Sequence, residues 1–187
     1  MATAFPGREP PPLGLVDLSP LPRAIGARRR AQRRRKRWPR DMRNASAATA
    51  AGDLVLRLSD RELLVMTAPG SDGEAVRALD VAIPGAGAWP VPRRDSHCAF
   101  TLRGDAAVDR HKLCGVDLRP TAFPAAAIAQ TSVARSAAVV CRPPDSDGRG
   151  YLLLADSASA IWFWDVLLDA MAEFDGGPLG LGELGKA

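Results

Sequence analysis

The stretch YLLLADSASAIWFWDVLLDAMAEFDG, residues 151–176, gives the clearest secondary-structure signals in the chain. Residues 151–156 form a short apolar run ending at an aspartate, which is typical of a buried strand. Ser157 or Ser159 then offers a helix cap, and a Gly-Gly-Pro sequence after Asp175 offers a stop. Between them, apolar residues recur at helical spacing: Ile161, Trp164, Leu168 and Met171. We therefore predict a strand followed at once by an amphipathic helix.

Shorter strand signals lie upstream of this unit. Residues 53–59, DLVLRLS, place a leucine at every second position, and 62–66, ELLVM, would pair with them as a hairpin. We also predict strands at 13–19 and 98–104, and two strands within 128–142.

Two further helices are predicted, one over 74–83 and one over 106–114, the second ending at Gly115. Residues 85–95, GAGAWPVPRRD, are expected to be a turn-rich connector. This order of strand pairs and helices favours an α+β fold with small antiparallel or mixed sheets and packed helices. It does not favour a doubly wound parallel fold.

The chain of 187 residues has the length of one ordinary domain. We predict a single α+β domain over residues 13–177, with a Pro/Gly-rich disordered tail at 1–12 and a flexible tail at 178–187. Within the domain, residues 24–52 form an atypical basic segment that we expect to be disordered.

The basic charge is concentrated in one run. Residues 28–43 contain ten basic residues and one acid, whereas the whole chain has a net charge of +4, so the remainder is net negative. The run is open to three interpretations: a nucleic-acid-binding segment, a nuclear-localisation patch, or a solvated charge run. Trp38 is the one aromatic residue among these cations, and clustered cations cannot enter a core. The third interpretation is therefore favoured.

Motifs of known chemistry are missing from the sequence. It has no phosphate-binding loop, nucleophile elbow or His-Glu-x-x-His motif. The three cysteines are far apart, which indicates neither a disulfide framework nor a thiolate metal site, and His97 and His111 have no partner motif. We therefore predict no catalytic, cofactor-binding or metal-binding residue in this chain.

Three consecutive aromatic residues are the candidate site. Trp162, Phe163 and Trp164 wrap more than one face of the predicted helix, so some of them are expected at a partner surface. The sequence has no run of about 18 apolar residues and its N-terminus lacks a secretory apolar region. We therefore expect a soluble cytoplasmic protein.

The second half of the chain resembles a known family. Residues 112–142, KLCGVDLRPTAFPAAAIAQTSVARSAAVVCR, together with 151–176, resemble the gamma subunit family of heterotetrameric sarcosine oxidase. That family is itself similar to part of the folate-binding aminomethyltransferase fold of the glycine cleavage system. Residues 16–23 and 89–100 resemble earlier segments of the same pattern. The matching signatures are Asp117-Leu118, Arg119-Pro120, Phe123-Pro124, Gln130-Thr131 to Ala134-Arg135, and Asp156-Ser157 to Trp164 and Leu167-Leu168.

The resemblance implies a subunit without chemistry of its own. Complexes of that family demethylate sarcosine oxidatively to glycine. Their flavins, FAD and FMN, the NAD, the tetrahydrofolate and the zinc belong to the alpha, beta and delta subunits. We therefore predict a non-catalytic, structural gamma-type subunit of a heterotetramer, in contact with its partners through Trp162, Phe163 and Trp164.

Three alternatives stay open on the sequence. The chain could be the equivalent subunit of an N-methylglutamate dehydrogenase-type complex, a free-standing folate- or one-carbon-binding protein, or a nucleic-acid-binding protein that uses the basic run. The resemblance also breaks after Arg23, where the family continues with a Lys-Gly pair and this chain has an Arg/Ala/Pro-rich insert. A reading-frame slip over residues 24–44 is our hypothesis for that break, and translating the other two frames of the coding DNA would test it.

Overall fold

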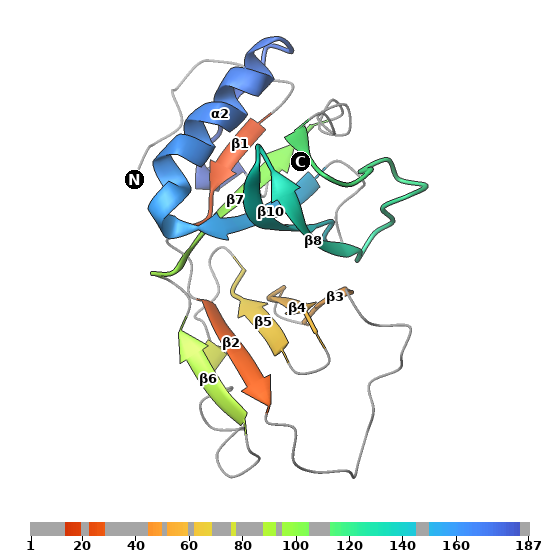
Figure 1. Ribbon diagram of the computed structural model, residues 1–187, viewed down its shortest axis with the longest axis vertical. Coiled ribbons are helices and arrows are strands. Elements are labelled where there is room, and N and C mark those ends of the chain that lie inside the picture. Colours follow the sequence, from red (N-terminus) through yellow and green to blue (C-terminus); the bar gives the residue numbers. More distant parts are fainter. Residues whose placement is uncertain are drawn as a thin grey trace.

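A computed structural model describes residues 14–19, 23–28, 45–49, 52–59, 62–68, 76–77, 88–92, 95–104, 113–144 and 150–183. Its described strands form two sheets (Figure 1). The order in the six-stranded sheet is β11 (Gly177–Pro178), β1 (Gly14–Asp17), β7 (His97–Arg103), β10 (Gly150–Asp156), β9 (Ser136–Cys141) and β8 (Ile128–Val133). The order in the five-stranded sheet is β3 (Ser46–Ala48), β4 (Leu54–Arg57), β5 (Glu62–Met66), β2 (Arg23–Arg28) and β6 (Ala88–Pro92).

The sheets are largely antiparallel, and β1 and β11 pair in parallel. The short 3₁₀ helix η3 (Ser157–Ser159) leads from β10 into α2 (Ala160–Ala172), and a second short 3₁₀ helix, η4 (Leu181–Glu183), follows β11. The fold is therefore α+β with small mixed sheets, which confirms the predicted class.

The molecule has three layers, with the six-stranded sheet in the middle. Helix α2 lies on one face of that sheet and the five-stranded sheet lies on the other side (Figure 1). Strand β10 shows how one sequence serves both layers, because successive side chains of a strand point to opposite faces. Tyr151 and Leu153 pack into the core on the α2 side, whereas Leu152 and Leu154 pack against the five-stranded sheet. The continuous apolar run in the sequence therefore reflects burial on both faces.

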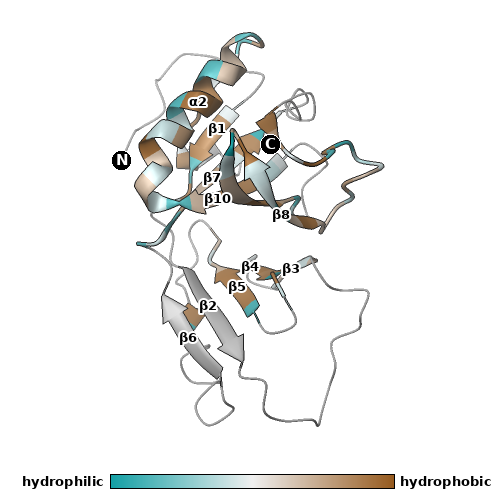
Figure 2. Cartoon of the chain, viewed as in Figure 1, coloured by the Kyte–Doolittle hydropathy of each residue, from teal (hydrophilic) through white to brown (hydrophobic). Residues whose placement is uncertain are grey.

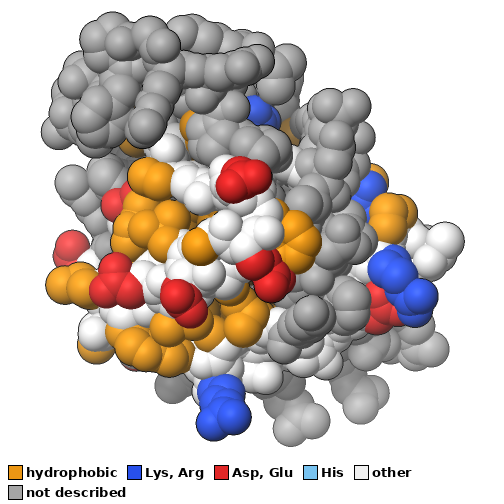
Figure 3. All heavy atoms as spheres, turned by 90° about the horizontal axis from the view of Figure 1, so that it is seen from above, with side chains coloured by type: hydrophobic (Ala, Val, Ile, Leu, Met, Phe, Trp, Pro, Cys, Tyr) orange, Lys and Arg blue, Asp and Glu red, His pale blue; other side chains and the backbone are white. Residues whose placement is uncertain are grey.

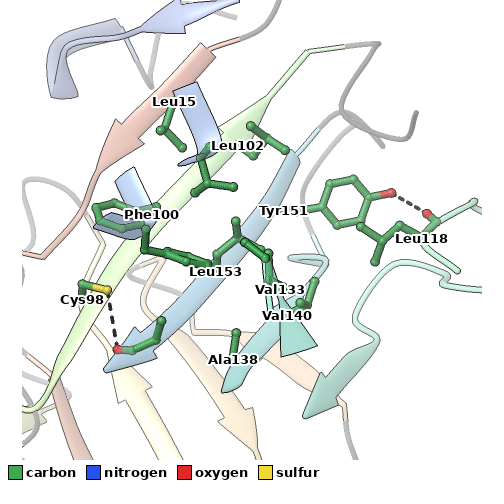
Figure 4. Packing of buried hydrophobic residues seen from close by; sticks show 14 of the residues in the cluster. Leu15, Cys98, Phe100, Leu102, Leu118, Val133, Ala138, Val140, Tyr151 and Leu153 are labelled. Carbon is green, nitrogen blue, oxygen red and sulfur yellow. Dashed lines mark hydrogen bonds between the residues drawn. The ribbon is translucent and has the colours of Figure 1, made fainter. Parts of the chain in front are cut away.

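The core under α2 is built from five neighbouring strands, β1, β7, β10, β9 and β8. Figure 4 shows Leu15, Phe100, Leu102 and Leu153 converging there, with Tyr151 at the side. The hydroxyl of Tyr151 donates a hydrogen bond of 2.6 Å to the carbonyl oxygen of Leu118. This bond joins the loop before β8 to the middle of the sheet.

The buried stripe of α2 differs from the predicted one. Phe163, Leu167 and Met171 are buried, whereas Ile161 is 80% exposed. Trp164 and Leu168 lie half-buried beside the core, so Met171 is the one predicted stripe residue that is fully buried. The helix is rotated because Phe163 stacks on Phe100, with ring centroids 5.9 Å apart. Hydropathy alternates along α2, with brown apolar segments between teal polar ones (Figure 2).

Ser159, one of the two predicted caps, is the N-cap residue of α2, but its side chain makes no capping hydrogen bond. The carboxylate of Asp156 caps the preceding η3 turn, where it accepts from the Ala158 amide at 2.8 Å. At the other end, the amide of Gly176 donates to Met171 O at 3.0 Å and that of Asp175 to Ala172 O at 3.2 Å. This pair of bonds is a Schellman motif. Asp175 occupies its left-handed position with φ 52°.

Most strand predictions are confirmed. The segments 13–19, 53–59, 62–66 and 98–104 contain β1, β4, β5 and β7, and 128–142 contains the β8–β9 hairpin. β4 and β5 pair antiparallel as predicted.

Other predictions are wrong. Residues 85–95 contain β6, an outer strand paired with β2, instead of a connector. The predicted helix cannot reach Cys114, because Cys114 forms a β-bridge with Val133; residues 105–112 lie outside the described residues. The helix predicted at 74–83 is not among the wrong ones, because both of its described residues, Val76 and Arg77, are helical.

Strands and a short helix also occur in segments that the sequence predicted to be disordered or flexible. Residues 24–28 of the segment 24–52 belong to β2, and residues 46–48 form β3. β2 pairs with β5 on one side and with β6 on the other, and this pairing is made by backbone groups. The basic residues 29–43 lie outside the described residues. Regular structure also extends past residue 177 into η4, although 178–187 was expected to be a tail. Among the described residues, no helix is both long and apolar enough to cross a membrane.

Candidate interaction surface

The three aromatic residues of the predicted site differ in burial, because successive residues of a helix point in different directions. Trp162 is 48% exposed, whereas Phe163 is fully buried and Trp164 lies half-buried with its ring centroid 5.4 Å from that of Phe100. Phe163 anchors α2 to the sheet, and the interface role of the three residues stays a prediction. Trp162 keeps a surface available to a partner, and Ile161 beside it was placed in the core by the sequence pattern although it is exposed.

Acidic residues continue the exposed face of α2. Asp165, Asp169 and Glu173 are all exposed and follow one another at four-residue spacing, so they lie on one side of the helix. We call Ile161, Trp162, Asp165, Asp169 and Glu173 together the α2 face. Figure 3, which looks at the molecule from the α2 end, shows hydrophobic and acidic side chains mixed over its centre, with Lys and Arg near its margins.

The charged residues in and around α2 are all acidic. The sequence from Gly150 to Gly185 contains no Lys or Arg, and its acids are Asp156, Asp165, Asp169, Glu173, Asp175 and Glu183. No basic residue lies in the last turn of α2, where a cation would interact favourably with the helix dipole. The α2 face is therefore apolar at its N-terminal end and acidic towards its C-terminal end.

The cysteines are not poised for nucleophilic chemistry. Burial raises the pKa of the Cys141 thiol to about 12, and the hydroxyl of Ser46, 3.4 Å away, offsets this only in part. Burial also raises the pKa of Cys114. Cys98 is buried, with Sγ 3.6 Å from the carbonyl oxygen of Ala155. A reactive cysteine ordinarily has a lowered pKa, whereas burial shifts the pKa of Cys114 and Cys141 in the opposite direction.

The remaining polar residues hold loops in place. His97 lies half-buried at the start of β7, its Nδ1 2.9 Å from Ser96 Oγ, while His111 lies outside the described residues. Asp117 forms an exposed ion pair with Arg119 at 2.6 Å, and Asp156 caps η3. Among the described residues, no three or more His, Cys, Asp or Glu side chains gather in a way that could hold a metal ion.

Sequence reasoning did not single out Arg142, one of two buried arginines among the described residues. Its Nη1 donates to the carbonyl oxygen of Phe123 at 3.0 Å, and its Nε is buried without a hydrogen-bond partner. The backbone of Arg142 also bonds to Ala126 and Ala127. No motif pointed to this residue, because an arginine just after a predicted strand ordinarily faces solvent.

Comparisons with known proteins define the class of fold. No protein-family model matches the chain, and no curated protein sequence matches it. Solved structures do match, and they show an α+β fold shared with aminomethyltransferase-like proteins.

One of these structures is a heterotetrameric sarcosine oxidase from Corynebacterium sp. U-96 in complex with pyrrole 2-carboxylate. It superposes with a TM-score of 0.69 at 18% identity, over 89% of this chain and 87% of that chain. Another is the glycine cleavage system aminomethyltransferase T from Bartonella henselae, with a TM-score of 0.63 at 11% identity over 92% of this chain. The match covers 49% of the aminomethyltransferase, so this chain spans about half of its length. Both likenesses show a related fold.

Proposed function

We propose that this chain is a non-catalytic, gamma-type structural subunit of an oxidoreductase complex of the heterotetrameric sarcosine oxidase type. The proposal rests on the match to the heterotetrameric sarcosine oxidase structure, which covers 89% of this chain and 87% of the other chain. A chain of nearly the same extent therefore occurs within a heterotetramer. The match to aminomethyltransferase T leaves about half of that enzyme without a counterpart.

The chemistry of the described residues supports an assembly role. The thiols of Cys114 and Cys141 have raised pKa values, and the exposed residues that stand out are a tryptophan, an isoleucine and a row of carboxylates on one helix. Such a surface can bind another protein. In this proposal FAD, FMN, NAD, tetrahydrofolate and zinc belong to the alpha, beta and delta subunits, and the complex demethylates sarcosine.

Co-expression tests the proposal directly. The tagged full chain would be produced together with the products of the neighbouring genes and purified through its tag. We expect a stable complex that contains flavin and consumes oxygen when sarcosine is added. Oxidation of N-methylglutamate in place of sarcosine would overturn the proposed substrate. Elution of the tagged chain alone, while the other subunits assemble without it, would overturn the proposed role.

A further inference from the structure

We propose that Arg142 binds a small carboxylate ligand through the edge of its guanidinium group that Nε and Nη2 form. The inference does not depend on the proposed function, because it concerns one buried side chain and a ligand that the chain can bind by itself. It gives a binding role to a residue that no sequence motif singled out.

Arg142 is a buried cation that lacks a neighbouring carboxylate. Its exposure is 7%, and no Asp or Glu in the described part of the chain forms an ion pair with it. Burial raises the pKa of the nearby Tyr151 phenol, and the positive charge of Arg142 offsets part of that rise. A buried charge is costly unless an opposite charge pairs with it. An anion at this position would therefore stabilise the folded chain.

Most hydrogen-bond donors of the guanidinium are unused. Nη1 donates to the carbonyl oxygen of Phe123 at 3.0 Å, whereas Nε is buried without a partner. Nη2 makes no hydrogen bond within the described part of the chain. The N–H groups of Nε and Nη2 lie parallel, in the geometry that receives both oxygens of one carboxylate. A single donor would be enough for Phe123, so that bond does not account for a whole guanidinium at this position.

The backbone on both sides of Arg142 is fixed. Its amide donates to the carbonyl oxygen of Ala127 at 3.0 Å, and its carbonyl oxygen accepts from the amide of Ala126 at 2.9 Å. Ala126 adopts φ 67°, a left-handed conformation that is uncommon for a residue other than glycine. The arginine is therefore held in place before any ligand arrives, which lowers the entropic cost of binding.

The surroundings of Arg142 restrict the ligand to a small monoanion. Phe123 is the one buried residue of the segment 119–125, so its contact with Arg142 lies just beneath an exposed loop. The low exposure of Arg142 admits a slender group, and its single positive charge matches a single negative charge. A phosphate dianion would bring a second buried charge without a partner. Formate and acetate are planar monocarboxylates and are the probes that fit this site.

The experiment measures binding of formate and acetate to the purified full chain. The Nε–H signal of Arg142 in an isotope-labelled sample should shift as sodium formate replaces sodium chloride at constant ionic strength, with half-saturation on the order of 1–10 mM. The melting temperature should rise over the same range. Arg142→Gln, which keeps a donor for Phe123, should abolish this rise, and Arg142→Lys should weaken binding at least about tenfold. Arg57→Gln, at the other buried arginine, is the matched control and should keep the response.

The wild type alone can overturn the proposal, even where a variant does not fold. An Nε–H signal and a melting temperature that are the same in formate, acetate and chloride would show that Arg142 binds no carboxylate. A rise in melting temperature of equal size in Arg142→Gln and in the wild type would place the ligand elsewhere and would also overturn it. Both results leave the proposed function standing, because no partner subunit takes part in the measurement.

Discussion

At the scale of single residues, burial decides what each polar group can do. Tyr151 keeps its hydroxyl bonded to Leu118 O inside the core, and Cys141 lies between the two sheets with Ser46 as its polar neighbour. Both are positions where a buried polar atom has one specific partner, which limits the cost of its burial.

The Cys141 thiol predicts a pH dependence of stability. Its pKa is raised to about 12 in the folded chain from an ordinary value of 9.0. The folded state therefore favours the protonated thiol, and the resulting stability is present below pH 9 and is lost as the pH rises from 9 towards 12. At pH 10.5 the loss would be on the order of 2 kcal/mol.

Urea unfolding of the wild type and of Cys141→Ala at several pH values measures this loss. The difference between the two unfolding free energies should move in favour of the alanine variant above pH 9. A difference that stays constant from pH 8 to 11 would contradict the prediction, because other titrating groups are common to both proteins.

At the scale of elements, α2 shows what a sequence can and cannot reveal. Its length and its Gly-rich stop were predictable, because caps and breakers are local signals. Its rotation was not, since residues 161–164 are all apolar and any of them fits a core-facing stripe. Contact with Phe100, which is distant in sequence, selects Phe163. The same rotation leaves Trp162 exposed and buries Phe163.

Strand β6 was missed for a related reason. Pro90 and Pro92 argue against a strand in a local pattern, and proline is tolerated in a sheet where its missing N–H points away from the neighbouring strand. An edge position makes that possible, and the sequence does not reveal which strand will be an edge. The β8–β9 hairpin was simpler to predict because both of its strands are continuous in sequence.

The Schellman motif at the end of α2 predicts a stabilising substitution. Asp175 has φ 52°, a region in which glycine is free of strain, and its carboxylate lies at the negative end of the helix dipole. Asp175→Gly should therefore raise the free energy of unfolding by about 1 kcal/mol in denaturant titrations. A lower value for this variant would contradict the assigned cap.

Gly176→Ala should change the stability in the opposite direction to Asp175→Gly. A Cβ at this position would lie 2.7 Å from Met171 Cβ and 2.9 Å from the Met171 carbonyl oxygen, both of them held by the helix. This substitution should lower the free energy of unfolding.

At the scale of the whole molecule, the middle sheet couples the outer layers. Leu152 and Leu154 of β10 pack with Leu56 and Leu64 of the other sheet, while Leu153 packs towards α2. Because the same strands have side chains in both cores, neither outer layer can lose its contacts without exposing the middle sheet. The three layers are expected to unfold as one unit.

Leu152→Ala tests that coupling. Leu152 is 1% exposed, and its truncation should cost about 2–5 kcal/mol. Although its side chain faces away from α2, thermal curves followed by far-UV circular dichroism and by tryptophan fluorescence should shift together to lower temperature. Separate transitions for the two signals would show that the layers unfold independently. Leu152→Met, which keeps the volume, should shift both curves much less.

The prolines of β6 affect how one copy of this chain behaves towards another. An edge strand normally presents a row of hydrogen-bonding groups on which another copy can add a strand, and Pro90 and Pro92 of β6 have no N–H to donate. Proline in an edge strand opposes such strand addition. At high concentration, molecules of this chain are therefore expected to stay dispersed instead of adding to one another along this edge.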